Sequence, residues 1–318
     1  MLNLLISLIL LLMALLSVAF FTLLERKIMS YCQIRKGPNK AFFMGLFQPF
    51  SDAIKLFSKE NNLMIYSNLL LYLISPVFSM ISALLLWMVF QFNSNLMNLN
   101  MTLIFFLCIS SMSSYSILMM GWASNSKYTL IGAYRGFSQI ISYEVSMALM
   151  LISLSLMIGS FSSSMFLEFQ EKYSIFLGIP MMFIIWMVIC MAETNRTPFD
   201  LSESESELVS GFNIEYSSWM FALIFMAEYS MIILVSMLTN YLFFGFFNFN
   251  NMITLMIMIL FILSRSTYVR VRYDKLMMLA WKVILPLTIF FFFKMIFLYF
   301  LFLYSFCINF WNLNLKEI

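Results

Sequence analysis

The chain has 318 residues, of which 63% are hydrophobic and 10% are charged, and its mean hydropathy is +0.93. A soluble domain could not bury so much apolar surface, so this composition excludes a soluble protein and predicts an all-α, polytopic membrane protein. The net charge is +3, and so small a value says little about partners.

Histidine and cysteine usage limits the chemistry further. The chain has no histidine, which excludes a bis-histidine haem and most copper sites. Its cysteines are widely spaced and form no CxxC pair, which argues against an iron–sulfur cluster, a zinc site or a disulfide framework. They are Cys32, Cys108, Cys190 and Cys307. We therefore expect neither a metal site nor a redox centre in this chain.

Apolar segments long enough to cross a bilayer recur along the whole sequence. We expect eight transmembrane helices, at about residues 2–24, 69–90, 101–122, 137–159, 175–192, 217–244, 251–268 and 283–307. They would form one transmembrane domain over residues 1–318, and an even number of spans leaves both termini on the same side of the membrane.

The basic residues predict the orientation of these spans. All but three of the 18 lysines and arginines lie in, or at the edges of, the connectors after spans 1, 3, 5 and 7; the exceptions are Lys172, Lys294 and Lys316. By the positive-inside rule, these odd-numbered connectors face the cytoplasm or matrix.

The first connector contains an amphipathic segment at residues 41–59. Apolar side chains recur in it at helical intervals, and Pro49 should break or tilt the helix near its middle. One interpretation is an interfacial helix that lies on the membrane. The alternative is that its apolar side covers a cavity for an amphipathic ligand.

Acidic residues also lie inside the predicted spans or at their ends, where a charge costs about 2.5–3.5 kcal/mol even on lenient scales. They are Glu144, Glu193, Glu215 and Glu228. Tyr143 directly precedes Glu144, and Tyr229 directly follows Glu228. Desolvation favours the neutral form of a carboxylic acid, which would let these groups take up and release protons. We favour a proton pathway over the alternative, in which each glutamate forms a structural ion pair between helices.

The connector after span 5 is the most acidic part of the chain. It carries Arg196, Asp200, Glu203, Glu205 and Glu207. On a helix, Glu203 and Glu207 would share one face and repel each other, so we expect a loop that needs counter-charges or protons.

Several segments resemble a known family. They are LERKIMSYCQIRKGPNK (24–40), QPFSDAIKLFSKE (48–60), GWASNSKY (121–128), ISYEVS (141–146), ETNRTPFDLSESESELVSGFNIEYSS (193–218), AEY (227–229) and RVRYDKLM (270–277). In sequence and order they resemble chain 1 of mitochondrial NADH–ubiquinone oxidoreductase and its bacterial homologues, over nearly the whole chain.

The resemblance implies a subunit of proton-pumping respiratory complex I in the mitochondrial inner membrane, located where the membrane arm meets the peripheral arm. Such a subunit forms the membrane part of the ubiquinone chamber and binds no cofactor of its own. NADH, flavin and iron–sulfur clusters belong to partner subunits, and ubiquinone is the substrate. The implied partners are the peripheral-arm subunits at the quinone site, small membrane-arm subunits and lipids, with no nucleic acid. The odd-numbered connectors would face the matrix, and both termini would face the intermembrane space.

The resemblance also assigns roles to residues. Those assigned to the quinone chamber are Arg26, Arg35, Asp52, Lys55, Phe225 and Arg272. Those assigned to a mobile coupling loop are Arg196, Asp200, Glu203, Glu205 and Glu207. The proton pathway would use Glu144, Glu193, Glu215 and Glu228, to which we add Tyr143 and Tyr229 as their neighbours.

The chain departs from the family pattern at Ser204, Val269, Val271 and Lys275, which affects the expected loop geometry.

Two other functions would use similar features of the sequence. One is a stand-alone ion/proton antiporter, against which we find no inverted repeat and no matched pair of broken helices. The other is a membrane anchor in a hydrogenase-like complex, which would not need a quinone passage.

Overall fold

A computed structural model describes residues 2–61, 66–88, 100–170, 174–202, 210–245 and 250–314, and every regular element within them is helical. Six helices are long and apolar enough to cross a membrane. They are α1 (Leu2–Cys32), α3 (Leu69–Trp87), α4 (Thr102–Ser124), α5 (Lys127–Ile158), α10 (Ser218–Phe243) and a helix composed of α12 (Tyr273–Met278), the π-helical segment η3 (Leu279–Ile284) and α13 (Leu285–Asn314). Shorter apolar helices, α8 (Pro180–Glu193) and α11 (Asn250–Thr267), coincide with the remaining two predicted spans. The predicted all-α, polytopic membrane fold is confirmed.

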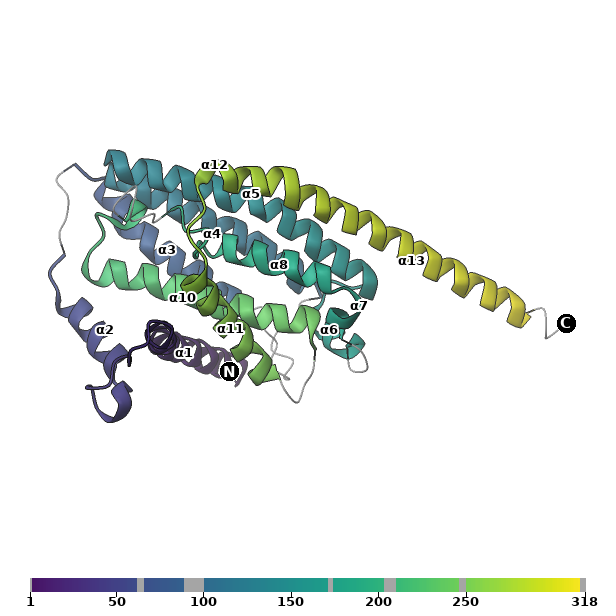
Figure 1. The fold of residues 1–318 in the computed structure, drawn as a ribbon, viewed down its shortest axis with the longest axis horizontal. Helices are drawn as coiled ribbons and strands as arrows, with labels where there is room; N and C mark the ends of the chain where they lie inside the picture. Colours follow the sequence, from purple (N-terminus) through teal and green to yellow (C-terminus); the bar gives the residue numbers. More distant parts are fainter. Residues whose placement is uncertain are drawn as a thin grey trace.

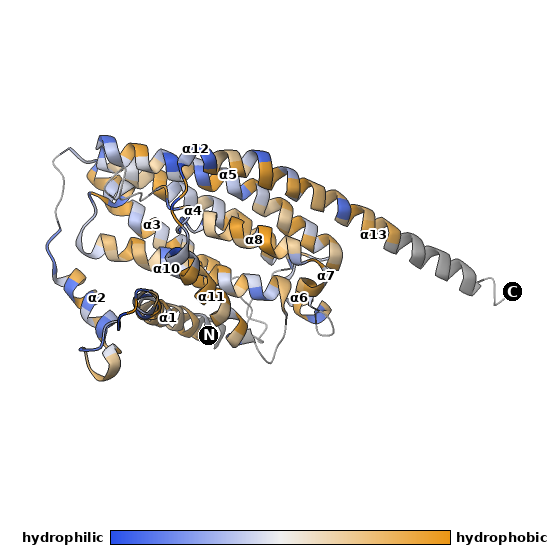
Figure 2. Cartoon of the chain, viewed as in Figure 1, coloured by the Kyte–Doolittle hydropathy of each residue, from blue (hydrophilic) through white to orange (hydrophobic). Residues whose placement is uncertain are grey.

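The long helices pack side by side, with α10 at the centre of the arrangement. Contacts run from α13 to α5, then through α4 and α3 to α10, and α8 packs on α5 (Figure 1). On its other side α10 contacts α1, α11 and the short helix α2 (Gln48–Ser58). Figure 2 shows hydrophobic residues along most of the long helices, including outward faces that a soluble protein would make polar. Helix α10 therefore lies between two groups of helices. One group consists of α3, α4, α5, α8 and α13, and the other of α1, α2 and α11.

Four helix boundaries differ clearly from the predicted ones, and one is that of the last span, which begins at Tyr273 with α12 rather than near residue 283. Helix α1 continues to Cys32 instead of ending near residue 24, and α5 begins at Lys127, ten residues before its predicted start. The predicted span at 175–192 is divided into α7 (Ile175–Gly178) and α8, because Pro180 lacks the N–H that a continuous helix requires and is tolerated only in a first turn.

The amphipathic segment is helical only in its second half. Pro49 lies in the first turn of α2, and the residues before it form a turn and the short helix η1 (Phe43–Gly45). Pro49 therefore lies at the start of the helix, and the break or tilt expected near the middle of a longer helix is not what the structure shows. Another short helix, α6 (Ser163–Phe169), follows α5.

Small residues allow close approach at the helix contacts, as is common in membrane proteins. The clearest case is Gly132 of α5, which faces the backbone of η2 (Gly211–Asn213). A Cβ atom at Gly132 would lie 2.9 Å from Gly211 Cα and 3.1 Å from Phe212 N. Since both neighbours are backbone atoms, a side chain here would have to push the segment away from α5.

Replacing Gly132 by alanine is therefore expected to destabilise the protein by about 1–3 kcal/mol, the typical cost of overpacking. The measurement is the heat-inactivation temperature of the purified assembly. Gly178→Ala is the matched control, because a Cβ atom at Gly178 meets no atom within 4 Å. Equal inactivation temperatures in the two variants would show that the close contact at Gly132 does not limit the stability of the protein.

Candidate functional site

A large cavity lies on the side of α10 that faces α1 and α2, and these two helices and the segment between them form much of its wall. Its volume is about 990 Å³, near the upper end of the 300–1,000 Å³ usual for ligand pockets. We call it the outer cavity. Its charged lining residues are Glu25, Arg26, Arg35, Lys36, Lys40, Asp52 and Arg265. Its apolar lining includes Leu15, Val18, Leu56, Phe57, Phe221 and Phe225. An apolar wall combined with a charged region suits a ligand with a greasy tail and a polar head.

Helix α2 contributes one face to this cavity. Pro49, Asp52, Ala53 and Leu56 all line it, and their spacing of three or four residues puts them on the same side of the helix. Ile54 points elsewhere, with 68% of its side chain exposed. Of the two interpretations of the amphipathic segment, the geometry favours the one in which it covers a cavity.

The structure brings together four of the six residues expected at a quinone chamber. Arg26, Arg35, Asp52 and Phe225 line the outer cavity, and Arg26 Nη1 lies 2.6 Å from Asp52 Oδ2. The other two do not line it. Lys55 is exposed on α2. Arg272 is also exposed, and its Nε lies 3.2 Å from Asp274 Oδ2.

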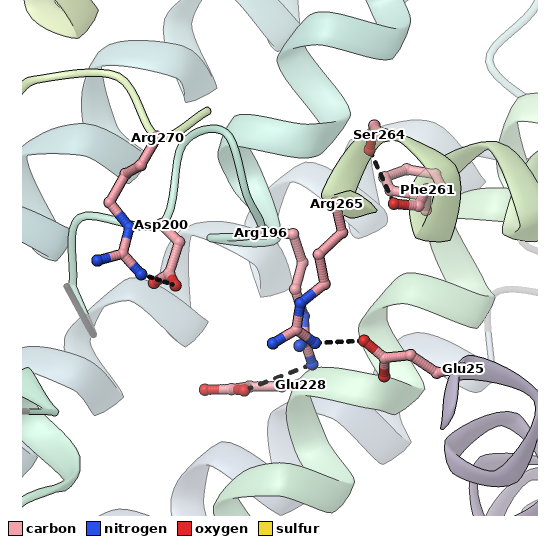
Figure 3. Close-up of polar contacts among 8 residues, drawn as sticks. All are labelled: Glu25, Arg196, Asp200, Glu228, Phe261, Ser264, Arg265 and Arg270. Atoms are coloured by element: carbon pink, nitrogen blue, oxygen red, sulfur yellow. Dashed lines mark hydrogen bonds and ion pairs between the residues drawn. The ribbon is translucent and has the colours of Figure 1, made fainter. Parts of the chain in front are cut away.

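Glu25 and Arg265, which were not among the predicted site residues, line the outer cavity and form an ion pair. Arg265 Nη1 donates to Glu25 Oε1, joining α11 to α1 (Figure 3). Glu25 is 92% buried and Tyr229 of α10 interacts with the same carboxylate. The only signal in the sequence was an acid directly after an apolar run, because its partner lies 240 positions away.

Arg196 connects this ion pair to the other side of α10. Its guanidinium lies 4.5 Å from the centre of the Tyr229 ring, and its Nη2 lies 3.8 Å from Glu228 Oε2. Figure 3 shows the Arg196 and Arg265 side chains extending toward the same region, one reaching Glu228 and the other Glu25. The described contacts thus run from the outer cavity through Tyr229 and Arg196 to Glu228.

A smaller cavity of about 80 Å³ lies on the opposite side of α10, where α10 faces α3 and α4. We call it the inner cavity. Glu193, Asn195 and Glu228 line it together with four serines, Ser79, Ser82, Ser113 and Ser116. Glu193 is 93% buried, and its Oε2 atom has no hydrogen-bond partner among the described residues. This buried carboxylate, one oxygen of which is unpaired in the described part of the chain, thus belongs to the wall of a cavity large enough for a few water molecules.

The serines of the inner cavity present acceptors rather than donors. Each hydroxyl donates to a backbone carbonyl of its own helix, at distances of 2.6–2.8 Å. Their remaining lone pairs are therefore the groups available to a guest. A cavity lined by hydroxyl lone pairs and carboxylates favours molecules that donate hydrogen bonds, such as water or a hydrated proton.

The other predicted acids surround these cavities without lining them. Glu144 on α5 interacts electrostatically with Glu193. Glu215 precedes α10, and its backbone carbonyl accepts a 2.6 Å hydrogen bond from the Tyr72 hydroxyl. Asp200 Oδ2 lies 3.3 Å from Arg270 Nη2 (Figure 3). Glu203, Glu205 and Glu207, together with Ser204, lie outside the described residues.

The two tyrosines differ in position. Tyr229 lines the outer cavity. Tyr143 is fully buried and donates a 3.3 Å hydrogen bond to the carbonyl of Leu276, at the start of the last helix. Tyr216 lies just before α10; burial raises the pKa of its hydroxyl, which lies 3.1 Å from the Ser75 hydroxyl of α3. Among the described residues there is no cluster of histidine, cysteine, aspartate or glutamate that could hold a metal.

Comparison with known proteins gives consistent matches. The family model described as NADH dehydrogenase matches residues 5–303. The NADH-ubiquinone oxidoreductase chain 1 of Rhipicephalus sanguineus is 55% identical over 304 residues, which is 96% of this chain and 97% of the relative. The proteins of the same name from Anopheles gambiae and Lemur catta are 50% and 48% identical, over 89% and 86% of this chain and 91% and 90% of theirs.

Proposed function

Because this chain belongs to the NADH-ubiquinone oxidoreductase chain 1 family, and so is a membrane subunit of NADH:ubiquinone oxidoreductase, we propose that its outer cavity binds the ubiquinone substrate and its inner cavity starts the proton pathway. The observation that carries this proposal is the geometry around α10. A cavity of ligand size lies on one side of α10, and a cavity lined by the buried Glu193 and the partly buried Glu228 lies on the other. Arg196 contacts Tyr229, which lines the first cavity, and Glu228, which lines the second.

The ligand chemistry supports ubiquinone in the outer cavity. Its isoprenoid tail matches the apolar side chains of α1 and α10, and its ring carbonyls can accept hydrogen bonds from arginine, lysine and tyrosine donors. Electrons would reach the quinone from iron–sulfur clusters and flavin in partner subunits, which oxidise NADH. Two electrons and two protons convert the quinone to the quinol, so each turnover needs a local proton supply.

The acids supply the second half of the mechanism. Negative charge that develops on the quinone near Arg265 weakens the hold of that arginine on Glu25. The neighbouring Arg196 responds, because it shares the field of Tyr229 and Arg265. Its attraction for Glu228 then changes, and protons redistribute through water in the inner cavity between Glu228, Glu193 and Glu144. Asp200, Glu203, Glu205 and Glu207 form the acidic loop that adjusts to this change, and Glu215 extends the pathway.

The location follows the same reasoning. The chain would lie in the mitochondrial inner membrane, with the basic connectors after the odd-numbered spans facing the matrix and both termini in the intermembrane space. Peripheral-arm subunits of the quinone site would then cover the matrix side of the outer cavity, where Arg35 and Lys36 lie. Small membrane-arm subunits and lipids would surround the spans.

A tryptophan in the wall of the outer cavity tests the ligand assignment. Ala53→Trp is expected to raise the apparent KM for a short-chain ubiquinone about fivefold, because the ring takes up ligand space at a cost of about 1 kcal/mol. NADH oxidation by artificial acceptors that take electrons upstream should stay unchanged. Ile54→Trp, one position along on the exposed face, is the matched control. Identical KM values in the two variants would remove ubiquinone from this cavity.

A further inference from the structure

A lysine lies in the middle of the last apolar helix. Lys294 is exposed on α13, and among the described residues it has no hydrogen bond or ion pair. The nearest residues with a charge or an amide along this helix are Lys282 and Asn309, about 18 Å and 22 Å away at 1.5 Å per residue. The hydrocarbon core of a bilayer is about 30 Å thick. Lys294 therefore lies near its centre.

This depth limits what can neutralise the charge. Lysines near the ends of a span extend their side chains to the lipid headgroups. At the bilayer centre the headgroups are too distant for that, and an unpaired ammonium is costly. The charge calls for a partner at the same depth.

The residues around Lys294 form a seam. Leu287, Phe290, Lys294, Phe297 and Leu301 are separated by alternating steps of three and four residues, and all five are exposed. Phe293, Leu298 and Phe300 on the neighbouring faces are exposed too, so the spacing and the position of Lys294 define the seam, and exposure alone does not. This spacing is the a and d pattern with which helices pack in a coiled coil. The face of α13 that packs into the bundle is a different one, marked by the buried residues Thr288, Phe291 and Met295. Figure 1 shows α13 extending beyond the rest of the bundle.

We propose that this seam docks a transmembrane helix of another subunit of the complex, and that the partner helix carries an aspartate or glutamate opposite Lys294. The complementary charge follows from the position of the lysine in hydrocarbon. A single polar residue at an a position of an apolar seam also fixes the register of the two helices. The partner is a protein and not a lipid because its charge must lie at mid-membrane depth. Family membership supplies the premise that membrane subunits surround this chain.

A zero-length cross-link tests the pairing in the intact complex. A membrane-permeant carbodiimide activates a carboxylate, and a neighbouring amine then forms an amide while the carbodiimide takes up the water as a urea. Mass spectrometry of the digest should show Lys294 joined to an acidic residue in an apolar peptide of another subunit. A Lys294 peptide that is joined to no protein would overturn the proposal.

Substitutions give a second readout. Lys294→Met and Lys294→Glu should remove the cross-link and leave the partner subunit substoichiometric in the purified complex, with the charge reversal having the larger effect. Lys282→Met, which removes an exposed lysine at the polar end of the same helix, should leave the partner content unchanged. If both Lys294 variants retain every subunit, or lose only a bound anionic lipid, the seam does not dock a protein.

Discussion

Replacing Glu193 by glutamine is expected to lower the rate of coupled ubiquinone reduction on the order of 100-fold, the usual contribution of a positioned proton-transfer group. Glutamine has nearly the same shape but cannot release a proton. Glu193 is 93% buried and lines the inner cavity, and its Oε2 atom has no partner among the described residues. The measurement is the rate of quinone reduction in membranes, with NADH oxidation by artificial acceptors as the internal reference.

Glu168→Gln is the matched control for this experiment, because it makes the same chemical change at an exposed residue of α6. It should retain the full coupled rate. Proton pumping at the normal rate in the Glu193→Gln enzyme would remove Glu193 from the proton pathway, whereas loss of activity with artificial acceptors would point to failed assembly instead.

Replacing Arg196 by leucine is expected to lower quinone turnover roughly thirtyfold, since a charged interaction of about 2 kcal/mol is lost. Arg196 is the described side chain that contacts both Tyr229, which lines the outer cavity, and Glu228, which lines the inner one. The apparent KM for quinone should change little, because Arg196 does not line the outer cavity. This combination, a lower kcat at constant KM, distinguishes transmission from binding.

Two further variants separate charge from shape at this position. Arg196→Lys keeps the positive charge near Glu228 but loses the planar group over the Tyr229 ring, so its turnover should lie between those of the wild type and Arg196→Leu. Lys127→Leu, at an exposed cation where α5 begins, should behave as the wild type. If Arg196→Leu turned over normally, coupling would have to bypass α10 by another route.

Much of the fold could be predicted from the sequence, because membrane spans are encoded locally. Hydropathy located all eight apolar helices. Pro49 was expected near the middle of a helix and instead lies in its first turn. The errors in the predicted helix boundaries lie where charged or small residues interrupt the apolar pattern. Helix α1 continues past Glu25 because that acid is buried against Arg265 rather than exposed in a loop. Helix α5 starts early because Gly132 packs against η2 instead of forming a turn.

The site was less predictable, because its parts come from distant positions. Amphipathicity of the first connector indicated a cavity wall, and the family motifs pointed to Arg26, Asp52 and Phe225, which line the outer cavity. The Glu25–Arg265 pair spans 240 positions and depends on how α11 crosses α1. Spacing along the chain carries no information about such a contact.

The central claim is that quinone reduction in the outer cavity changes the protonation of Glu193 in the inner cavity through Arg196. Infrared difference spectroscopy of the complex, triggered by quinone reduction, measures this directly in the carbonyl-stretch band of protonated carboxylic acids. We predict a band change in the wild type and in Glu168→Gln that disappears in Glu193→Gln and weakens in Arg196→Leu when the same amount of quinol is formed. A band change of equal size in all four proteins would contradict the claim.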